Sequence, residues 1–353
     1  MIMVKKKIRW KVLRRRLLCC FFCSLIVGSC FSLPTNGRTS DDKSLLFLWW
    51  NVENLFDTKN DPNTNDDDFT PTGKLQWTAR KLLLKQMRIR HLLAAVAAHP
   101  EYQKYPDLLA FAEVENQQVF DETLRGIRDV SYKTIYHESA DLRGIDIALA
   151  YNPKTIRAET SKAYAVPLAS RRTRSIIVAR FSAGGHPFHV ILNHWPSRSF
   201  DTAWSEPKRI AAATVARHIL DSLLVSNPKA DIVVMGDFND EASNKSLAQV
   251  LGSSFDKKAV EASGTRLLYN CWSGYEGIGS YFFNKRWQRI DHILLSAGML
   301  DQSGITAPKN AFRCFSFSKL LDGKKPYATY EKGRYKGGYS DHLPLLLKAR
   351  ILP

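Results

Sequence analysis

Residues 232–239 read IVVMGDFN, a short apolar run that ends abruptly in Gly236, Asp237, Phe238 and Asn239. Such a run, bounded by a turn signal, favours a buried β-strand. The polar residues then fall in the loop at the end of the strand, where a rigid sheet places functional groups. The same arrangement recurs along the chain, which predicts a sheet with chemistry at its edge.

Apolar runs of this kind predict several strands, which alternate with helical patterns. The runs cover residues 45–50, 108–112, 147–151, 176–181, 188–192, 232–235, 290–295 and 343–347. One predicted helix is capped by Thr78 and continues to Val96, and a second spans Ile210 to Leu223 with Pro207 near its start. No internal repeat or long linker divides this region, so we predict one domain over 44–353.

The amino terminus predicts an export signal, because a basic stretch ending at Arg16 precedes an apolar run over 17–27. That run is too short to span a bilayer. The following Val27-Gly28-Ser29-Cys30 resembles a bacterial lipobox, whose Cys becomes the lipidated first residue; the alternative is a plain signal peptide with an incidental Cys30. We predict a lipoprotein-type signal peptide over 1–29 and a tether over 30–43. The protein would be a bacterial lipoprotein, exported to the periplasm or cell surface and anchored to the membrane.

The net charge is +17, and eight of the basic residues that produce it precede residue 17. Removal of the leader leaves a net charge of +9, which favours a polyanionic substrate without determining the fold. Of six cysteines, only Cys271 and Cys314 remain in the body if Cys30 is lipidated. They could pair in an oxidising compartment, but two isolated cysteines form no disulfide framework, and buried free thiols are preferred.

The segment from Asn60 to Asp68 is dense in Asn and Asp. It reads either as a solvated loop or as a calcium loop. The spacing lacks the Gly and the terminal Glu of the calcium hand, which favours the solvated loop.

Polar residues gather where six of the apolar runs begin or end. In order they are Asn51-Val52-Glu53, Glu113, Asn193-His194, Gly236-Asp237-Phe238-Asn239, Asp291-His292 and Ser340-Asp341-His342. Each alone is weak evidence, because such residues usually form caps or turns. Together they supply carboxylates for a hard cation, amides for phosphate oxygens and imidazoles for a leaving group. These are the groups that phosphoester hydrolysis needs.

This ordered series resembles the endonuclease/exonuclease/phosphatase superfamily, which includes deoxyribonucleases, abasic-site endonucleases, neutral sphingomyelinases and inositol polyphosphate phosphatases. The resemblance runs from Asn51 to His342. It implies an α+β fold, a four-layer αββα sandwich of two packed mixed β-sheets flanked by helices, with the site at one edge of the sheets. One departure is Ala112, where many members carry a Gln that helps to position the metal ligand.

The resemblance implies a Mg²⁺ site, at which Mn²⁺ is an alternative, with Glu113 as the principal ligand. Glu53 and Asp341 would complete the coordination, directly or through water.

For the catalytic groups, the resemblance implies that Asp237 activates the attacking water while Asn51 and Asn239 hold phosphate oxygens. Asp291 would bond to His342 and keep it protonated.

His194 would supply a second imidazole, with Asn193 beside it in substrate binding. Asp146 is a candidate to orient His194, and a strand-edge turn residue is the equal alternative. Arg143 and Arg198 would bind a substrate phosphate, although solvent-exposed surface roles fit the sequence as well.

We expect a Mg²⁺-dependent phosphodiesterase or nuclease that cleaves by in-line attack of an activated water. The alternative is a sphingomyelinase-like or inositol-phosphatase-like enzyme acting on lipid or sugar phosphates, because loops decide the substrate. A secreted binding protein, or an anchored nucleic-acid binder without catalysis, is disfavoured because every core position is filled. No protein partner is implied.

Overall fold

The computed structural model describes residues 43–169, 172–198, 202–264 and 266–353. Within them the chain forms a compact unit that extends to Pro353. The predicted signal peptide, Cys30 and the tether up to residue 42 lie outside the described residues.

The first sheet is mixed, with the strand order β14-β20-β1-β2-β4-β3, and β15 also pairs with β20. Strands β1 and β2 are parallel, and the remaining pairs are antiparallel. The strands are β1 (Ser44–Leu55), β2 (Leu108–Val114), β3 (Lys133–Tyr136), β4 (Asp146–Tyr151), β14 (Ile305–Thr306), β15 (Phe312–Cys314) and β20 (Leu345–Ile351).

The second sheet is also mixed, with the order β5-β6-β7-β8-β13-β10-β9. Here β7 and β8 are parallel, as are β9 and β10. Its strands are β5 (Arg157–Tyr164), β6 (Ile176–Ala183), β7 (His186–His194), β8 (Asp231–Asp237), β9 (Ser253–Ser254), β10 (Leu268–Asn270) and β13 (Asp291–Leu295).

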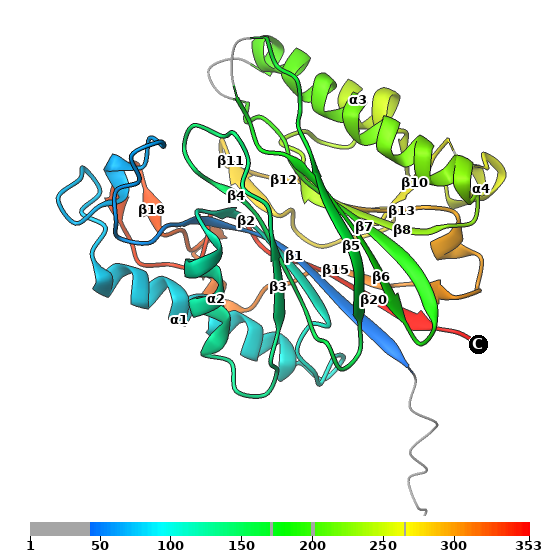
Figure 1. The fold of residues 1–353 in the computed structure, drawn as a ribbon, viewed down its shortest axis with the longest axis horizontal. Helices are drawn as coiled ribbons and strands as arrows, with labels where there is room; N and C mark the ends of the chain where they lie inside the picture. The colour runs from blue at the N-terminus through cyan, green and yellow to red at the C-terminus, as the bar shows by residue number, and fades with distance from the viewer. Residues whose placement is uncertain (1–42, 170–171, 199–201, 265) are drawn as a thin grey trace, which may run out of the picture. The chain divides into compact units, whose positions relative to one another are not determined.

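Helices cover the outer face of each sheet (Figure 1). Helices α1 (Ala79–Ala97) and α2 (Gln117–Arg125) lie on the first sheet, and α3 (Thr202–Ser226) and α4 (Lys257–Ala262) lie on the second. Three short hairpins lie outside the two sheets: β11 (Tyr281–Phe283) with β12 (Arg286–Gln288), β16 (Leu321–Asp322) with β17 (Lys325–Pro326), and β18 (Tyr330–Glu331) with β19 (Arg334–Tyr335). A π-helix spans Ser246–Leu251, and short 3-10 helices span Asp67–Phe69, Gly298–Leu300 and Ser318–Leu320.

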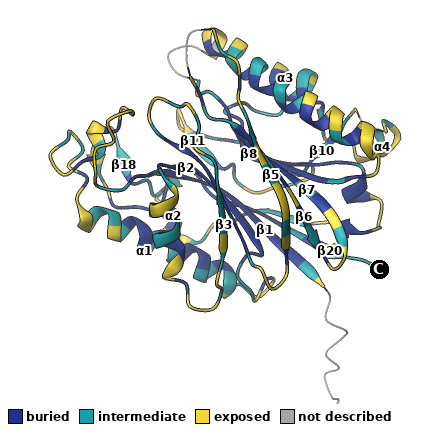
Figure 2. Cartoon of the chain, in the orientation of Figure 1, coloured by how far each residue is buried: buried dark blue, intermediate teal, exposed yellow. Residues whose placement is uncertain are grey.

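The side-chain alternation of the central strands creates the layers. In β8, Val233 and Met235 belong to the core between the sheets, whereas Ile232 and Val234 pack in the core that contains α3. Across the two sheets, Phe47 meets Phe188 edge to face with ring centroids 5.8 Å apart. Figure 2 shows the central strands buried and the outer helix faces exposed. The predicted α+β sandwich with two mixed sheets is therefore confirmed.

All the predicted strands are present, but β3, β5 and the short strands β9 to β12 and β14 to β19 were not predicted. Strand β5 lies at the sheet edge, and its side chains, such as Arg157, are largely polar and exposed. It therefore lacks the apolar run from which the other strands were predicted. Thr78 stands at the N-cap position of α1 with extended backbone, although its side chain forms no capping bond. Helix α3 begins at Thr202, so Pro207 lies inside it.

Cys271 and Cys314 are free and buried, which confirms the preference for unpaired thiols. In the part of the chain that the structure describes, no helix has the length and apolarity required to cross a membrane.

Candidate active site

Strand pairing brings the predicted polar residues to one edge of the two sheets. Parallel strands end at the same edge, so His194 at the end of β7 lies opposite Asp237 at the end of β8. The antiparallel strand β13 begins there, which places Asp291 opposite Asp237 on its other side. In the first sheet, Asn51 of β1 pairs with Ala112 of β2, directly before Glu113.

Gly236 is required where these strands converge. A Cβ atom at this position would lie 2.5 Å from the carbonyl oxygen of Asn193 on the neighbouring strand. No side chain fits at that distance, so only glycine allows β7 and β8 to approach closely enough to align His194 with Asp237.

Several site residues adopt the left-handed backbone region, which is rare for residues other than glycine. The φ angles are 53° for Glu53, 65° for Glu113 and 52° for Asn239. Glu113 lies at an irregularity in the pairing of β2 with β4, between Ala112 and Val114. Such strained positions cluster at functional sites, where the surrounding structure holds them.

His342 and Asp291 form a buried pair with 2.7 Å between Nδ1 and Oδ2. Ser280 Oγ donates to the same carboxylate oxygen at 2.7 Å, and Trp49 Nε1 donates to the other at 3.0 Å. Burial disfavours the charged imidazole, but Asp291, Asp341 and Asp237 together raise the pKa of His342 well above its ordinary value. The pair therefore presents a cationic Nε2 to the site.

Asp237 faces that imidazole, with 3.9 Å between its Oδ2 and His342 Nε2. Its Oδ2 accepts a hydrogen bond from Asn51 Nδ2 at 3.2 Å, and its Oδ1 accepts one from the backbone N–H of Asn239 at 2.9 Å. Burial and the charge of Asp291 raise the pKa of Asp237 to about 7. A carboxylate with this pKa is suited to accept a proton near neutral pH.

His194 completes the inner surface, with Nε2 3.8 Å from Asp237 Oδ2 and 4.0 Å from Glu113 Oε1. Burial and the nearby Arg174 and Arg143 lower its pKa well below the ordinary value, so the imidazole is neutral. Asp146 does not orient it: Asp146 Oδ2 accepts hydrogen bonds from Tyr136 and Ser139. Among the described residues, His194 Nδ1 has no hydrogen-bond partner.

Asn193, predicted to bind substrate, lies away from the site. Its side chain is buried and bonds to the backbone carbonyls of Ile191 and Met235 and to Trp195 Nε1. The reason is the strand alternation, which turns neighbouring side chains to opposite faces.

The three predicted metal ligands lie close enough for their charges to interact: burial and Asp341 raise the pKa of Glu53, and burial and Glu113 raise the pKa of Asp341. In the described ranges, their oxygens do not all lie within 4.8 Å of one another. The two oxygens of Glu53 instead accept the backbone N–H groups of Thr329 at 2.5 Å and Tyr330 at 2.9 Å. Glu53 thus holds the loop that precedes β18.

Glu113 and Asp341 remain at the open edge, with their side chains 15% and 42% exposed. Glu113 Oε2 accepts the backbone N–H of Asn54 at 3.0 Å, and its Oε1 lies 3.4 Å from Asn51 Nδ2. Accessible carboxylate and amide oxygens without thiolates fit a hard divalent cation.

The two predicted phosphate-binding arginines both lie near the edge. Arg143 donates to Asn54 Oδ1 at 2.5 Å, and Arg198 donates to Gln288 Oε1 at 2.5 Å.

Tyr281 was not identified from the sequence, although its ring centroid lies 4.7 Å from that of His342. Arg174 was also missed; it donates to the carbonyl oxygen of Trp195 at 2.8 Å. Their positions come from loops and strand ends far apart in sequence, so no local motif marks them.

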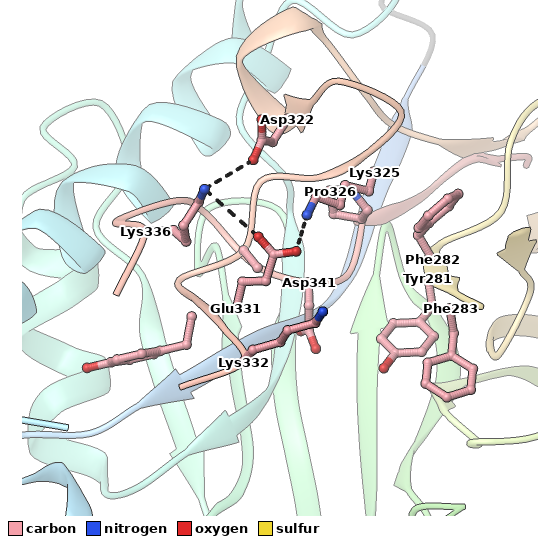
Figure 3. A pocket seen from close by; sticks show the side chains of 12 residues that line it. Tyr281, Phe282, Phe283, Asp322, Lys325, Pro326, Glu331, Lys332, Lys336 and Asp341 are labelled. Carbon is pink, nitrogen blue, oxygen red and sulfur yellow. Dashed lines mark hydrogen bonds and ion pairs between the residues drawn. The ribbon is translucent and has the colours of Figure 1, made fainter. Parts of the chain in front are cut away.

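A pocket of about 300 Å³ opens beside Asp341 (Figure 3). Aromatic side chains of the β11 hairpin strand, including Tyr281 and Phe283, line one side. Lys332 and Lys336 lie on the other side, where Lys336 is 3.7 Å from Asp322. The pocket therefore offers aromatic surface next to the catalytic edge, together with three lysines, of which Lys325 and Lys336 pair with Glu331 and Asp322.

Carboxylates, amides and imidazoles at this edge are the groups that metal-dependent hydrolysis of a phosphoester uses, and a family match assigns the chain to that class of enzyme. The profile of the Endonuclease/Exonuclease/phosphatase family matches residues 47–350, and the chain belongs to this family. No curated protein sequence matches the chain.

Solved structures with the same fold share little sequence with this chain. TDP2 of D. rerio, complexed with single strand DNA product, has 17% identity and a TM-score of 0.53, with 88% of this chain and 100% of that chain covered. The human Nocturnin catalytic domain with bound sulfate has 15% identity and a TM-score of 0.52, with 88% and 95% covered. A family protein from Bacteroides thetaiotaomicron has 14% identity and a TM-score of 0.52, with 88% and 95% covered.

Proposed function

We propose that the protein is a Mg²⁺-dependent phosphodiesterase that hydrolyses nucleic acid by in-line attack of an activated water. The main support is that a carboxylate and a protonated imidazole face each other in the site. Asp237 is a carboxylate whose pKa is raised to about 7, and it faces the cationic His342 at 3.9 Å. One can accept a proton from water while the other stabilises the negative charge that develops on the phosphate.

Glu113 and Asp341 would hold the Mg²⁺, which neutralises phosphate charge and polarises the P–O bond when bound. The neutral imidazole of His194 donates a hydrogen bond to a phosphate oxygen without adding charge. Asn51 keeps Asp237 oriented through its amide. Asn239 Nδ2 is held by the carbonyl oxygen of Trp195 at 3.1 Å, which leaves its side-chain oxygen available to orient water or substrate.

The pocket beside Asp341 favours a nucleic-acid substrate. The ring of Tyr281 offers a stacking surface for a base, and Lys332 offers charge for a flanking phosphate. The surplus of positive charge in the body acts in the same direction. The similarly folded TDP2 of D. rerio was solved with a single strand DNA product, which agrees with this choice. Lipid and sugar phosphates are the competing substrates.

Metal dependence is the first test. We expect EDTA to abolish hydrolysis by the purified full chain and Mg²⁺ to restore it, with Mn²⁺ as a substitute, because the accessible ligands are hard oxygens. The assay uses DNA, RNA, sphingomyelin, phosphoinositides and an activated phosphodiester in parallel. Full activity after exhaustive chelation, or stoichiometric zinc in the protein, contradicts the metal assignment; turnover of sphingomyelin or phosphoinositides alone contradicts the substrate assignment.

We also propose that the enzyme is a lipoprotein, exported and anchored through Cys30. The support is the basic leader, the apolar run and the motif Val27-Gly28-Ser29-Cys30. Mass spectrometry of the membrane fraction of a bacterial host should find an acylated Cys30 as the first residue, and Cys30→Ser should release the protein from that fraction. An unmodified mature amino terminus at another residue would refute the proposal.

A further inference from the structure

A second group of carboxylates lies where the loop between β1 and α1 meets the end of β2. Asp61, Asp66 and Glu115 each bring one carboxylate oxygen within 4.8 Å of the others. Asp66 is 1% exposed and Glu115 is 6% exposed, whereas Asp61 is exposed. Two of the three carboxyl groups are therefore largely removed from solvent, while the third faces it, and burial raises the pKa of Glu115 to about 8 in the absence of a cation.

Asp66 lacks a partner that a buried carboxylate needs. Its Oδ2 accepts the backbone N–H of Asp61 at 3.0 Å, but its Oδ1 is buried and has no hydrogen-bond partner among the described residues. Within the same ranges, none of the three carboxylates lies within 4.0 Å of a Lys, Arg or His nitrogen. An unpaired buried oxygen is costly, so it indicates a positively charged ligand.

We infer that Asp61, Asp66 and Glu115 form a binding site for a hard divalent cation, with Ca²⁺ as the best match. All three donors are carboxylate oxygens, which Ca²⁺ and Mg²⁺ prefer and which disfavour soft metals. Ca²⁺ accepts about six to eight oxygens in irregular geometry, whereas Mg²⁺ demands a near-ideal octahedron. A site assembled from an irregular loop and a strand end suits the more tolerant ion. The inference does not depend on the proposed reaction.

Such an ion would hold the loop against the edge of the active site. The backbone N–H of Asp57 donates to Glu115 Oε2 at 2.6 Å, and that of Asn65 donates to the carbonyl oxygen of Leu142 at 2.6 Å. Glu115 is two residues beyond Glu113, and Leu142 directly precedes Arg143. The cation would therefore fix the loop beside two residues of the candidate active site.

The sequence favours a solvated loop over 60–68 because its spacing lacks the Gly and the terminal Glu of the calcium hand. That pattern requires all protein ligands within one loop. Here the third carboxylate, Glu115, comes from the residue that follows strand β2, so no spacing within the loop can reveal the site.

Thermal unfolding of the chelated full chain with and without Ca²⁺ tests the inference. At a concentration about a hundredfold above the dissociation constant, Ca²⁺ should raise the Tm by roughly 5 °C. In Asp66→Asn, and in the second variant Asp61→Asn, this shift should fall below about 1 °C, because a ligand charge is lost. Asp68→Asn removes the same charge from an exposed residue of the same loop and should keep the full shift.

The variant Glu113→Ala distinguishes Ca²⁺ binding at this site from binding in the active site, since it removes the principal metal ligand expected in the active site. The shift should persist in Glu113→Ala, and calorimetry of this variant should still detect bound Ca²⁺. Loss of the shift in Glu113→Ala but not in Asp66→Asn would place the ion in the active site and overturn the inference. An unchanged Tm of the parent protein at millimolar Ca²⁺, or equal loss in Asp68→Asn, would overturn it as well.

Discussion

His342→Ala is expected to lower kcat/KM by more than about a hundredfold, the usual effect of removing a group that stabilises charge in the transition state. The imidazole is buried and held at 2.7 Å by Asp291, so no solvent cation can take its place. Initial rates with the activated phosphodiester measure the loss. His186→Ala, at the opposite end of strand β7, is the control and should retain full activity.

The partnership with Asp291 has its own signature in the pH profile. If a cationic His342 is required, activity falls as pH rises through its pKa. Asp291→Asn removes the charge that raises this pKa, so the alkaline limb should move to lower pH. The double variant should be little worse than His342→Ala alone, because the two residues act as one unit. An unchanged profile in folded Asp291→Asn, or losses that multiply, would show that they act separately.

Asp237→Asn is expected to lower kcat by roughly a thousandfold, within the range for loss of a general base. The amide has nearly the same shape, and its one carbonyl oxygen can still accept a hydrogen bond from either Asn51 Nδ2 or the Asn239 N–H, but it cannot accept a proton. The loss should not respond to added Mg²⁺. Glu113→Ala should instead be partly rescued by high Mg²⁺, because its defect is weaker metal binding. Activity titrations at increasing Mg²⁺ distinguish the two variants, and rescue of Asp237→Asn would show that Asp237 serves the metal instead.

Parts of the fold that depend on burial were predictable from the sequence, and parts at the periphery were not. A run such as 232–235 must lie inside, since both of its faces are apolar, and this predicted β8. Strand β5 is defined by its pairing with β6, and its exposed side chains carry no apolar signal.

The same division holds within the site. The motifs around Asp237 and His342 were recognisable because apolar strands end there and because the residue order matches a known family. Glu53 matched that family pattern as well, yet its carboxylate lies against the backbone of Thr329 and Tyr330. Which way a side chain turns depends on neighbours that are distant in sequence.

By itself the sequence determined the buried strands and the order of the catalytic motifs, because apolar runs and the residues that end them are local properties. The sandwich and the edge at which the motifs meet followed from the resemblance of that ordered series to a known family. The tertiary structure alone decided that Asn193 faces inward, that Asp146 serves Tyr136 and Ser139, and that Asp61 and Asp66 meet Glu115. These outcomes depend on the distance and orientation between side chains on separate elements, which only packing sets.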